Sequence, residues 1–164
     1  MQEYLTEAVV LDREPSGDLD FRVSLFTKKF GKMVAKVKSA RKITSKLSGH
    51  LIPGNIVNAR IIEKNGLQVV DAVKKSAISC GSDFYFLNKV LADAEPDLAI
   101  WQKITSNNFQ WLEILKTLGW DPEFASCSSC SRSNPKSFNF RSQEFLCANC
   151  FLNFGKKELL YINI

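Results

Sequence analysis

Four cysteines are the residues whose types and spacing most clearly indicate chemistry. Cys127 and Cys130 form one C-x2-C pair, and Cys147 and Cys150 form a second pair sixteen residues further on. Two-residue spacing lets both thiolates of a pair reach one metal ion at about 2.3 Å, and two such pairs complete a tetrahedral shell. Four thiolates leave no open coordination position. The pattern therefore predicts a structural Zn²⁺ site, in preference to a catalytic metal or to four buried free cysteines.

The segment between the two cysteine pairs, Phe138–Phe145, has the alternation of a small β-hairpin, as zinc ribbons have. The fifth cysteine, Cys80, stands apart, and we interpret it as a buried or strand-end thiol. An odd number of cysteines argues against a disulfide framework. No uncharged apolar run approaches the ~20 residues needed to span a bilayer, and Met1-Gln2-Glu3-Tyr4 does not begin a secretory leader. We therefore expect a cytoplasmic protein.

A second group of residues is strongly basic. Residues 1–80 carry 14 Lys and Arg against 8 Asp and Glu, a balance of +6, whereas residues 81–164 carry 8 against 9, a balance of −1. The 19 residues from Lys28 to Lys46 contain eight cations and no carboxylate. A solvated face is the ordinary interpretation of a charge run, but a run without any carboxylate favours a polyanion, and nucleic acid is the usual one.

The elements that position these cations are predicted to be strands. Period-two alternation indicates five strands, near Tyr4–Asp12, Phe21–Lys28, Lys32–Ala40, Asn55–Glu63 and Leu67–Val73. Asn65-Gly66 is a type I′ hairpin signal between the last two. Five short strands with a longer connection between the third and the fourth match an OB-fold barrel.

One face of the second and third strands is predicted to bind nucleic acid. Phe21, Val23 and Leu25 should point into the barrel, as should Met33, Ala35 and Val37 from the third strand. The opposite face would be basic, with Phe26 embedded in it for base stacking, although a neighbouring helix could equally cover this ring. The candidate nucleic-acid contacts are Arg22, Phe26, Lys28, Lys32, Lys36, Lys38, Arg41, Lys42, Lys46 and His50.

From Phe84 onwards the apolar period becomes helical. It predicts two helices separated at Pro96, the second capped by Asp97 and ended near Gly119. The expected fold is α+β, with a five-stranded OB-fold barrel, a short helical segment and a zinc ribbon-like element holding four cysteines. We expect a nucleic-acid-binding domain over residues 1–80 and a helical, metal-binding domain over residues 81–164.

Catalytic signatures are absent from the sequence. The only histidine, His50, has no Ser or Cys nucleophile signature with it, the H-x-E pattern of zinc deaminases is missing, and there is no GxxxxGK[ST] phosphate loop. We therefore expect a protein that is not an enzyme.

The sequence resembles the RecO family of bacterial recombination mediators. The resemblance lies in Ala8-Val-Val-Leu11, Gly17-Asp18, Leu25-Phe-Thr27, Phe30-Gly31-Lys32, Lys38-Ser-Ala-Arg-Lys42, Ser45-Lys46-Leu47, Gly49-His50-Leu51, Pro53, Leu112–Gly119, Pro122 and the four cysteines. It implies a DNA repair and recombination protein, associated with the nucleoid, that binds single- and double-stranded DNA and anneals complementary strands. It also implies that RecR is a partner in loading RecA.

The sequence departs from the family at two places. Ser39 stands where members commonly have glycine. Fourteen residues follow Cys150, where longer members continue with helices that contact the tail of single-strand-binding protein, so that this partner is left open. A protein-interaction module and an RNA-binding module remain alternatives, because OB-folds also bind RNA.

Overall fold

The computed structural model describes residues 2–78, 83–91, 95–106 and 109–162. Within them the chain divides into two compact units, residues 1–101 and 102–164. The boundary expected at residue 80, and Cys80 itself, lie outside the described residues. None of the described helices is long and apolar enough to cross a membrane.

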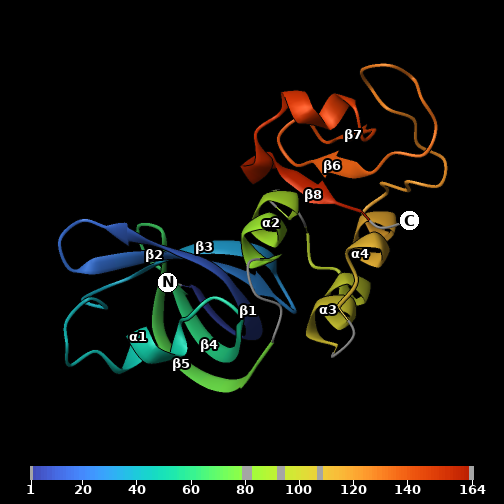
Figure 1. Ribbon diagram of the computed structural model, residues 1–164. Coiled ribbons are helices and arrows are strands. Elements are labelled where there is room, and N and C mark those ends of the chain that lie inside the picture. The colour runs from blue at the N-terminus through green and yellow to red at the C-terminus, as the bar shows by residue number, and fades with distance from the viewer. Residues whose placement is uncertain (1, 79–82, 92–94, 107–108, 163–164) are drawn as a thin grey trace. The chain divides into compact units, whose positions relative to one another are not determined.

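The first unit contains a closed barrel of five strands (Figure 1), which confirms the predicted OB-fold. The strands follow one another around the barrel in the order β1-β2-β3-β5-β4. Their bounds are β1 Gln2–Ser16, β2 Asp20–Thr27, β3 Gly31–Val37, β4 Asn55–Glu63 and β5 Leu67–Ala77. All neighbouring pairs are antiparallel except β3 and β5, which close the barrel in parallel through Lys36 and Gln68.

The barrel core follows the predicted alternation. Val23 and Leu25 of β2 are buried, as are Ala35 and Val37 of β3, and partly buried Phe21 packs against them. A bulge in β1 between Val10 and Asp12 lets that long strand bend and pair with β4 at one end and β2 at the other. The Asn65-Gly66 turn has positive φ at both residues, 54° and 104°, as the type I′ prediction requires.

Two short helices pack on the barrel. The helix α1, Lys46–His50, lies in the connection between β3 and β4 and was not predicted. Arg13 Nη1 donates to the Ser48 carbonyl at 3.1 Å and holds α1 against β1. The helix α2, Asp83–Val90, covers part of the outer face of β1, where Asn88 Nδ2 donates to Asp12 Oδ2 at 3.3 Å.

The prediction of one continuous helix after Pro96 is wrong, because the structure has two helices there. These are α3, Leu98–Thr105, and α4, Trp111–Thr117. The cap prediction is confirmed, since Asp97 Oδ1 accepts a hydrogen bond from the Ile100 N–H at 3.0 Å. The run Ser106-Asn107-Asn108 has low helix propensity, and α4 begins after Gln110, which is extended.

The second unit contains a three-stranded antiparallel sheet in the order β7-β6-β8. The strands β6, Ser137–Asn139, and β7, Glu144–Leu146, form the predicted hairpin, and β8, Leu159–Tyr161, adds a strand that was not predicted. Two 3₁₀ turns, η1 Cys150–Asn153 and η2 Lys156–Glu158, connect β7 to β8. Aromatic rings from this unit pack together, with Phe138 in contact with Trp120 and Phe145.

Candidate nucleic-acid interface and metal centre

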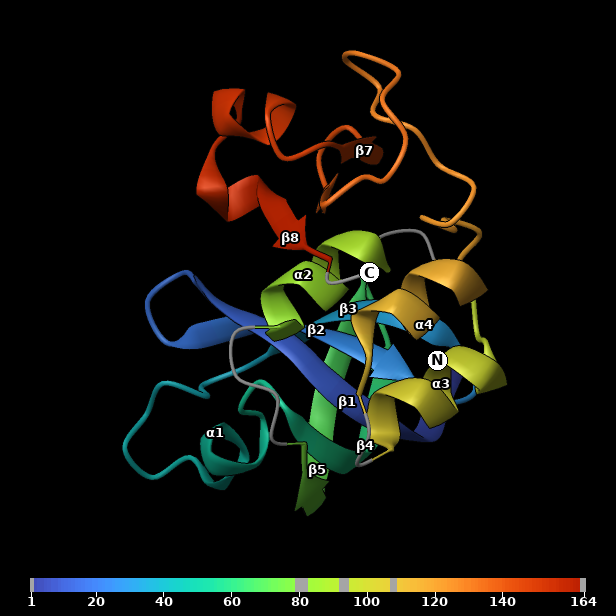
Figure 2. The same cartoon turned by 45° about the vertical axis from the view of Figure 1, so that its right-hand side comes forward.

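The candidate nucleic-acid interface is built on two loops at one edge of the barrel. They are the β1–β2 turn, residues 17–19, and the segment after β3, residues 38–46, here called the basic loop (Figures 1 and 2). The Arg41 N–H donates to the Leu19 carbonyl at 2.9 Å, and Arg41 Nη1 donates to the Gly17 carbonyl at 3.3 Å. The two loops therefore form one surface.

Asp20 holds the base of the basic loop. Its carboxylate accepts a hydrogen bond from the Ser39 N–H at 2.8 Å and an ion pair from Lys36 Nζ at 2.8 Å. Ser39 adopts a left-handed φ of 53°, a backbone conformation that glycine adopts more readily than other residues. The hydrogen bond donated by Lys36, and after it the one donated by the Ser39 N–H, lowers the pKa of the Asp20 carboxyl below its ordinary value.

Four cations of the basic loop are exposed and form no ion pair within 4.0 Å among the described residues: Lys38, Arg41, Lys42 and Lys46. Arg22 is exposed beside them on β2, directly across from Lys36. Like charges directly opposite each other repel, and Asp20 relieves this by pairing with Lys36. The surface thus keeps a local excess of positive charge.

Other cations of the predicted set are paired with carboxylates from different strands. Lys28 lies 3.7 Å from Glu7 of β1, which also pairs with Lys75. The basic run has no carboxylate in sequence, but the fold supplies Glu7 and Asp20 to it. Apart from Lys29 in the β2–β3 turn, the exposed cations of the run that have no ion pair among the described residues lie after β3.

Phe26 does not offer a stacking surface, and this part of the prediction is wrong. Its side chain is completely buried, and its ring centroid lies 6.2 Å from that of Trp101, which is itself 5% exposed. Lys32, opposite Phe26 on β3, donates from Nζ to the Asn88 carbonyl at 2.6 Å. Because α2 ends there, the ammonium group lies at the negative end of the helix. This part of the face is covered by protein.

His50 joins α1 to the barrel through two hydrogen bonds. Its Nδ1 accepts a hydrogen bond from the Lys74 N–H at 3.2 Å, and its carbonyl accepts one from Asn55 Nδ2 at 2.9 Å. These bonds fix the end of α1 against β4 and β5. Nε2 is the ring nitrogen left for a ligand.

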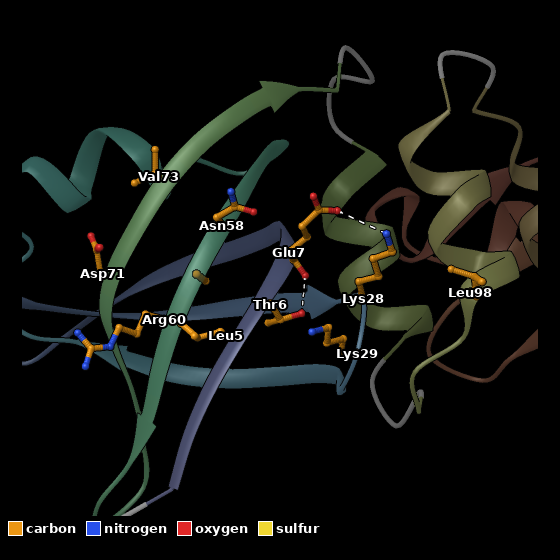
Figure 3. A pocket seen from close by; sticks show the side chains of 11 residues that line it. Leu5, Thr6, Glu7, Lys28, Lys29, Asn58, Arg60, Asp71, Val73 and Leu98 are labelled. Carbon is orange, nitrogen blue, oxygen red and sulfur yellow. Dashed lines mark hydrogen bonds and ion pairs between the residues drawn. The ribbon is translucent and has the colours of Figure 1, made fainter.

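An open groove of about 680 Å³ lies on another face of the barrel, over β1, β4 and β5 (Figure 3). Its apolar lining includes the exposed side chains of Leu5, Val73 and Leu98. The charges at its rim have both signs, and Lys28 is paired with Glu7 there. Mixed, paired charge does not favour a polyanion, so we place no nucleic-acid contact in this groove.

The four predicted metal ligands come together in the second unit. Their sulfur atoms all lie within 4.8 Å of one another, and Sγ of Cys130 lies 3.7 Å from Sγ of Cys147. Four sulfurs bonded at about 2.3 Å to a central tetrahedral ion are about 3.8 Å apart. The four cysteines are therefore positioned to hold one metal ion, and the donor set is compatible with zinc.

Local backbone turns place the cysteines. The Ser131 N–H donates to the Cys127 carbonyl at 2.8 Å, and the Phe151 N–H donates to the Cys147 carbonyl at 3.1 Å, so each pair is closed into a turn. Ser131 completes the first turn with a φ of 58°. Cys147 follows directly after β7, so the hairpin sets its position relative to the first pair.

The backbone around the cysteines favours thiolates. Burial raises the pKa of Cys127, but N–H groups of Cys147, Ser129 and Cys130 outweigh it and hold this pKa at about 6. N–H groups of Cys150 and Asn149 lower the pKa of Cys147. Cys150 is the exception, because its S–H donates to the sulfurs of Cys130 and Cys147, which raises its pKa to about 12. Four thiolates this close repel one another, and a cation removes that repulsion.

Sequence reasoning missed three residues of the candidate nucleic-acid interface. Asp20 lies outside the basic run, and only the fold brings it to Ser39 and Lys36. Leu19 and Ile43 are exposed apolar residues within the two loops, at 45% and 105%. The signal for Ile43 was its place in a run otherwise made of polar and basic residues, Arg41 to Lys46.

Comparison with known proteins gives a consistent result. Residues 1–77 match the family model described as recombination protein O N terminal. DNA repair protein RecO of Thermodesulfovibrio yellowstonii is 26% identical, over 90% of this chain and 70% of the relative. RecO of Thermoanaerobacter sp. (strain X514) is 26% identical over 88% and 70%. RecO of Chlorobium limicola is 38% identical over 74% of this chain and 58% of the relative.

Proposed function

Because this chain belongs to the RecO family, we propose that it is a non-catalytic DNA-binding protein of recombinational repair. It binds single- and double-stranded DNA and promotes the annealing of complementary strands. Its partner is RecR, with which it loads RecA onto single strands. DNA binding would associate it with the nucleoid in the cytoplasm.

The observation that carries this proposal is the basic loop. Four exposed cations lie within nine residues, on a loop fixed to the barrel by Asp20 and Arg41. Because the cations are already held in place, binding of a polyanion does not carry the entropy cost of ordering the loop. The surface also lies beside β2 and β3, the strands with which OB-folds bind single strands.

The mechanism needs only electrostatics. Lysine and arginine side chains neutralise backbone phosphates and release the counterions condensed on them. Two complementary strands that are partly neutralised repel each other less, so their encounter becomes faster. Phosphate contacts carry no base information, and binding should therefore tolerate any sequence.

The charge of the basic loop provides the test of this function. We expect the full-length quadruple variant Lys38→Ala, Arg41→Ala, Lys42→Ala and Lys46→Ala to lose affinity for single-stranded and duplex DNA alike. If the four cations neutralise about four phosphates, the slope of log affinity against log salt concentration should be near −3 for a single strand and the native protein. In the variant, the contribution of these four contacts to the slope should fall to near zero. Fluorescence anisotropy with labelled oligonucleotides at several salt concentrations measures both quantities.

The matched control is a triple variant at other exposed cations, Lys64→Ala, Lys156→Ala and Lys157→Ala, which lowers net charge outside the loop. Native affinity in the quadruple variant, or a flat salt response of the native protein, contradicts the proposal. Further titrations, with RNA of the same sequence as the single-stranded DNA, decide between DNA and RNA as the preferred ligand.

We infer that the ion held by the four cysteines is Zn²⁺ and that it is structural. All four tetrahedral positions are taken by protein sulfurs, so no position is left for water or substrate. We also propose the division of labour expected from sequence, with the nucleic-acid surface in residues 1–80 and the metal site in residues 81–164.

A further inference from the structure

We propose that Leu19 and Ile43 contact the bases of a bound single strand, so that the basic loop surface selects unpaired DNA over duplex. This inference rests on the proposed function and adds to it the residues and the kind of contact that distinguish the two forms of DNA. It starts from the burial of Phe26, which leaves the predicted stacking ring unable to meet a base.

The two aliphatic side chains lie among the open cations. Leu19 is next to Arg41, whose N–H donates to the Leu19 carbonyl at 2.9 Å, and Ile43 lies two residues after Arg41. Ile43 is as exposed as in an extended peptide, at 105%, and Leu19 is 45% exposed. Neither the basic loop nor the β1–β2 turn contains an aromatic residue. Aliphatic side chains are thus the apolar groups that these two loops present.

The charge around these side chains identifies the ligand that can cover them. An apolar protein surface would have to leave Lys38, Arg41, Lys42 and Lys46 unpaired or bring carboxylates to them. A single-stranded nucleic acid supplies both requirements, since its phosphates pair with the cations and its unstacked bases have apolar faces. A duplex offers the phosphates but keeps its base faces stacked inside. Aliphatic residues are also the groups that proteins insert beside bases when they unstack them.

The loops are held in a defined arrangement before any ligand arrives. Hydrogen bonds close the basic loop from Lys42 N–H to the Ser39 carbonyl at 3.2 Å and from Ser45 N–H to the Lys42 carbonyl at 2.9 Å. Ile43 lies inside the second of these turns. Its side chain is therefore displayed by ordered backbone.

The experiment compares three labelled ligands with equal numbers of phosphates: a thymidine oligonucleotide, a duplex, and a single-stranded abasic chain. We expect the full-length variant Leu19→Ser/Ile43→Ser to bind the thymidine strand roughly fivefold more weakly than the native protein, and the duplex and abasic chain equally well. Ile43→Ser alone removes a side chain that is fully exposed, so it keeps the fold while showing part of the effect.

The matched control is Leu5→Ser, which removes an aliphatic side chain that is 62% exposed, near the other end of β1 and in the groove of Figure 3. It should bind all three ligands as the native protein does. An unchanged thymidine affinity in Leu19→Ser/Ile43→Ser, or an equal loss for the abasic chain, overturns the inference and leaves the proposed function standing. Failure of the quadruple charge variant to weaken any ligand overturns the proposed function itself, and this inference with it.

Discussion

Asp20 shows how one residue sets the properties of the proposed nucleic-acid surface. Its carboxylate orders the basic loop through the Ser39 N–H and at the same time neutralises Lys36. These partners lower its pKa. A carboxyl with a lowered folded-state pKa stabilises the fold above its unfolded pKa, and that stability is lost as pH falls through the lowered value. The anchor is therefore fully formed at neutral pH and fails only in acid.

Replacing Asp20 by asparagine should strengthen DNA binding. The amide oxygen of the introduced asparagine can still accept the Ser39 hydrogen bond, while Lys36 loses its ion pair and becomes free for a phosphate. One additional phosphate contact steepens the log–log salt slope for a single strand by about 0.7. Anisotropy titrations of the Asp20→Asn variant at three salt concentrations measure this change.

Asp18→Asn is the control for that variant. Asp18 is exposed in the same β1–β2 turn and has no ion pair among the described residues, so this variant removes an equal charge without releasing a cation. It should raise affinity slightly and leave the slope unchanged. Equal slopes for both variants would mean that Lys36 does not reach DNA.

At the scale of elements, the sequence predicts what local pattern controls. β4 has the predicted bounds, Asn55–Glu63, because a β-branched alternating run is bounded by a turn at each end. The clustering of the four cysteines is also predictable, since the two-residue spacing within each pair is a local pattern. The order of the strands around the barrel could be inferred only indirectly, from the number of strands and from the position of the long connection between β3 and β4.

What the sequence could not predict depends on distant contacts. Alternation places Phe26 on the outer face, but only the packing of α2 and Trp101 decides that this face is covered there. The pairing of Lys28 with Glu7 is equally invisible, because the two residues are on different strands. The strand β8 was missed because three residues are too few to show a period.

Gly54 tests the packing of α2 on the barrel. Its φ is +89°, and a Cβ there would lie 2.8 Å from Cε2 of the Phe84 ring. The free energy of unfolding of the Gly54→Ala variant should therefore fall by about 1–3 kcal/mol because of backbone strain. It should fall by about as much again because the new Cβ displaces the Phe84 ring. Urea denaturation followed by circular dichroism measures the free energy of unfolding.

Gly66→Ala separates the two contributions to that loss. Gly66 has a φ of +104°, and nothing lies within 4 Å of a Cβ placed there. Its variant should lose only the strain energy. If both variants are destabilised equally, Phe84 yields without cost and does not fix α2 in place.

At the scale of the whole molecule, the two units are stabilised by different means. Residues 1–101 have a barrel core of buried aliphatic side chains, and the open cations belong to this unit. Residues 102–164 have three strands of three residues each, packed aromatic rings around Phe138, and a small cluster of buried side chains around Cys127 and Cys147. We infer that a unit this small depends on a metal ion for its stability.

Removing the metal should therefore unfold the second unit and leave the DNA surface intact. Structural zinc contributes roughly 10–16 kcal/mol of apparent binding free energy, more than this unit's core can replace. We expect a strong chelator, or the variant Cys130→Ser, to abolish the tryptophan signal from the Trp120–Phe138 contact. Affinity for a single strand should stay within about twofold of native, because the proposed DNA contacts all belong to residues 1–101 and not to the unit that holds the four cysteines.

Ser129→Ala is the control, because it keeps the backbone N–H that faces Cys127 and removes no sulfur. It should retain one metal ion per chain, measured with a colorimetric chelator after unfolding, and the native fluorescence. Loss of DNA binding in Cys130→Ser but not in Ser129→Ala would show that the metal-bound unit itself contacts DNA. Native fluorescence after complete removal of the metal would show that the ion is not structural, since the buried side chains of the second unit would then suffice to hold it together.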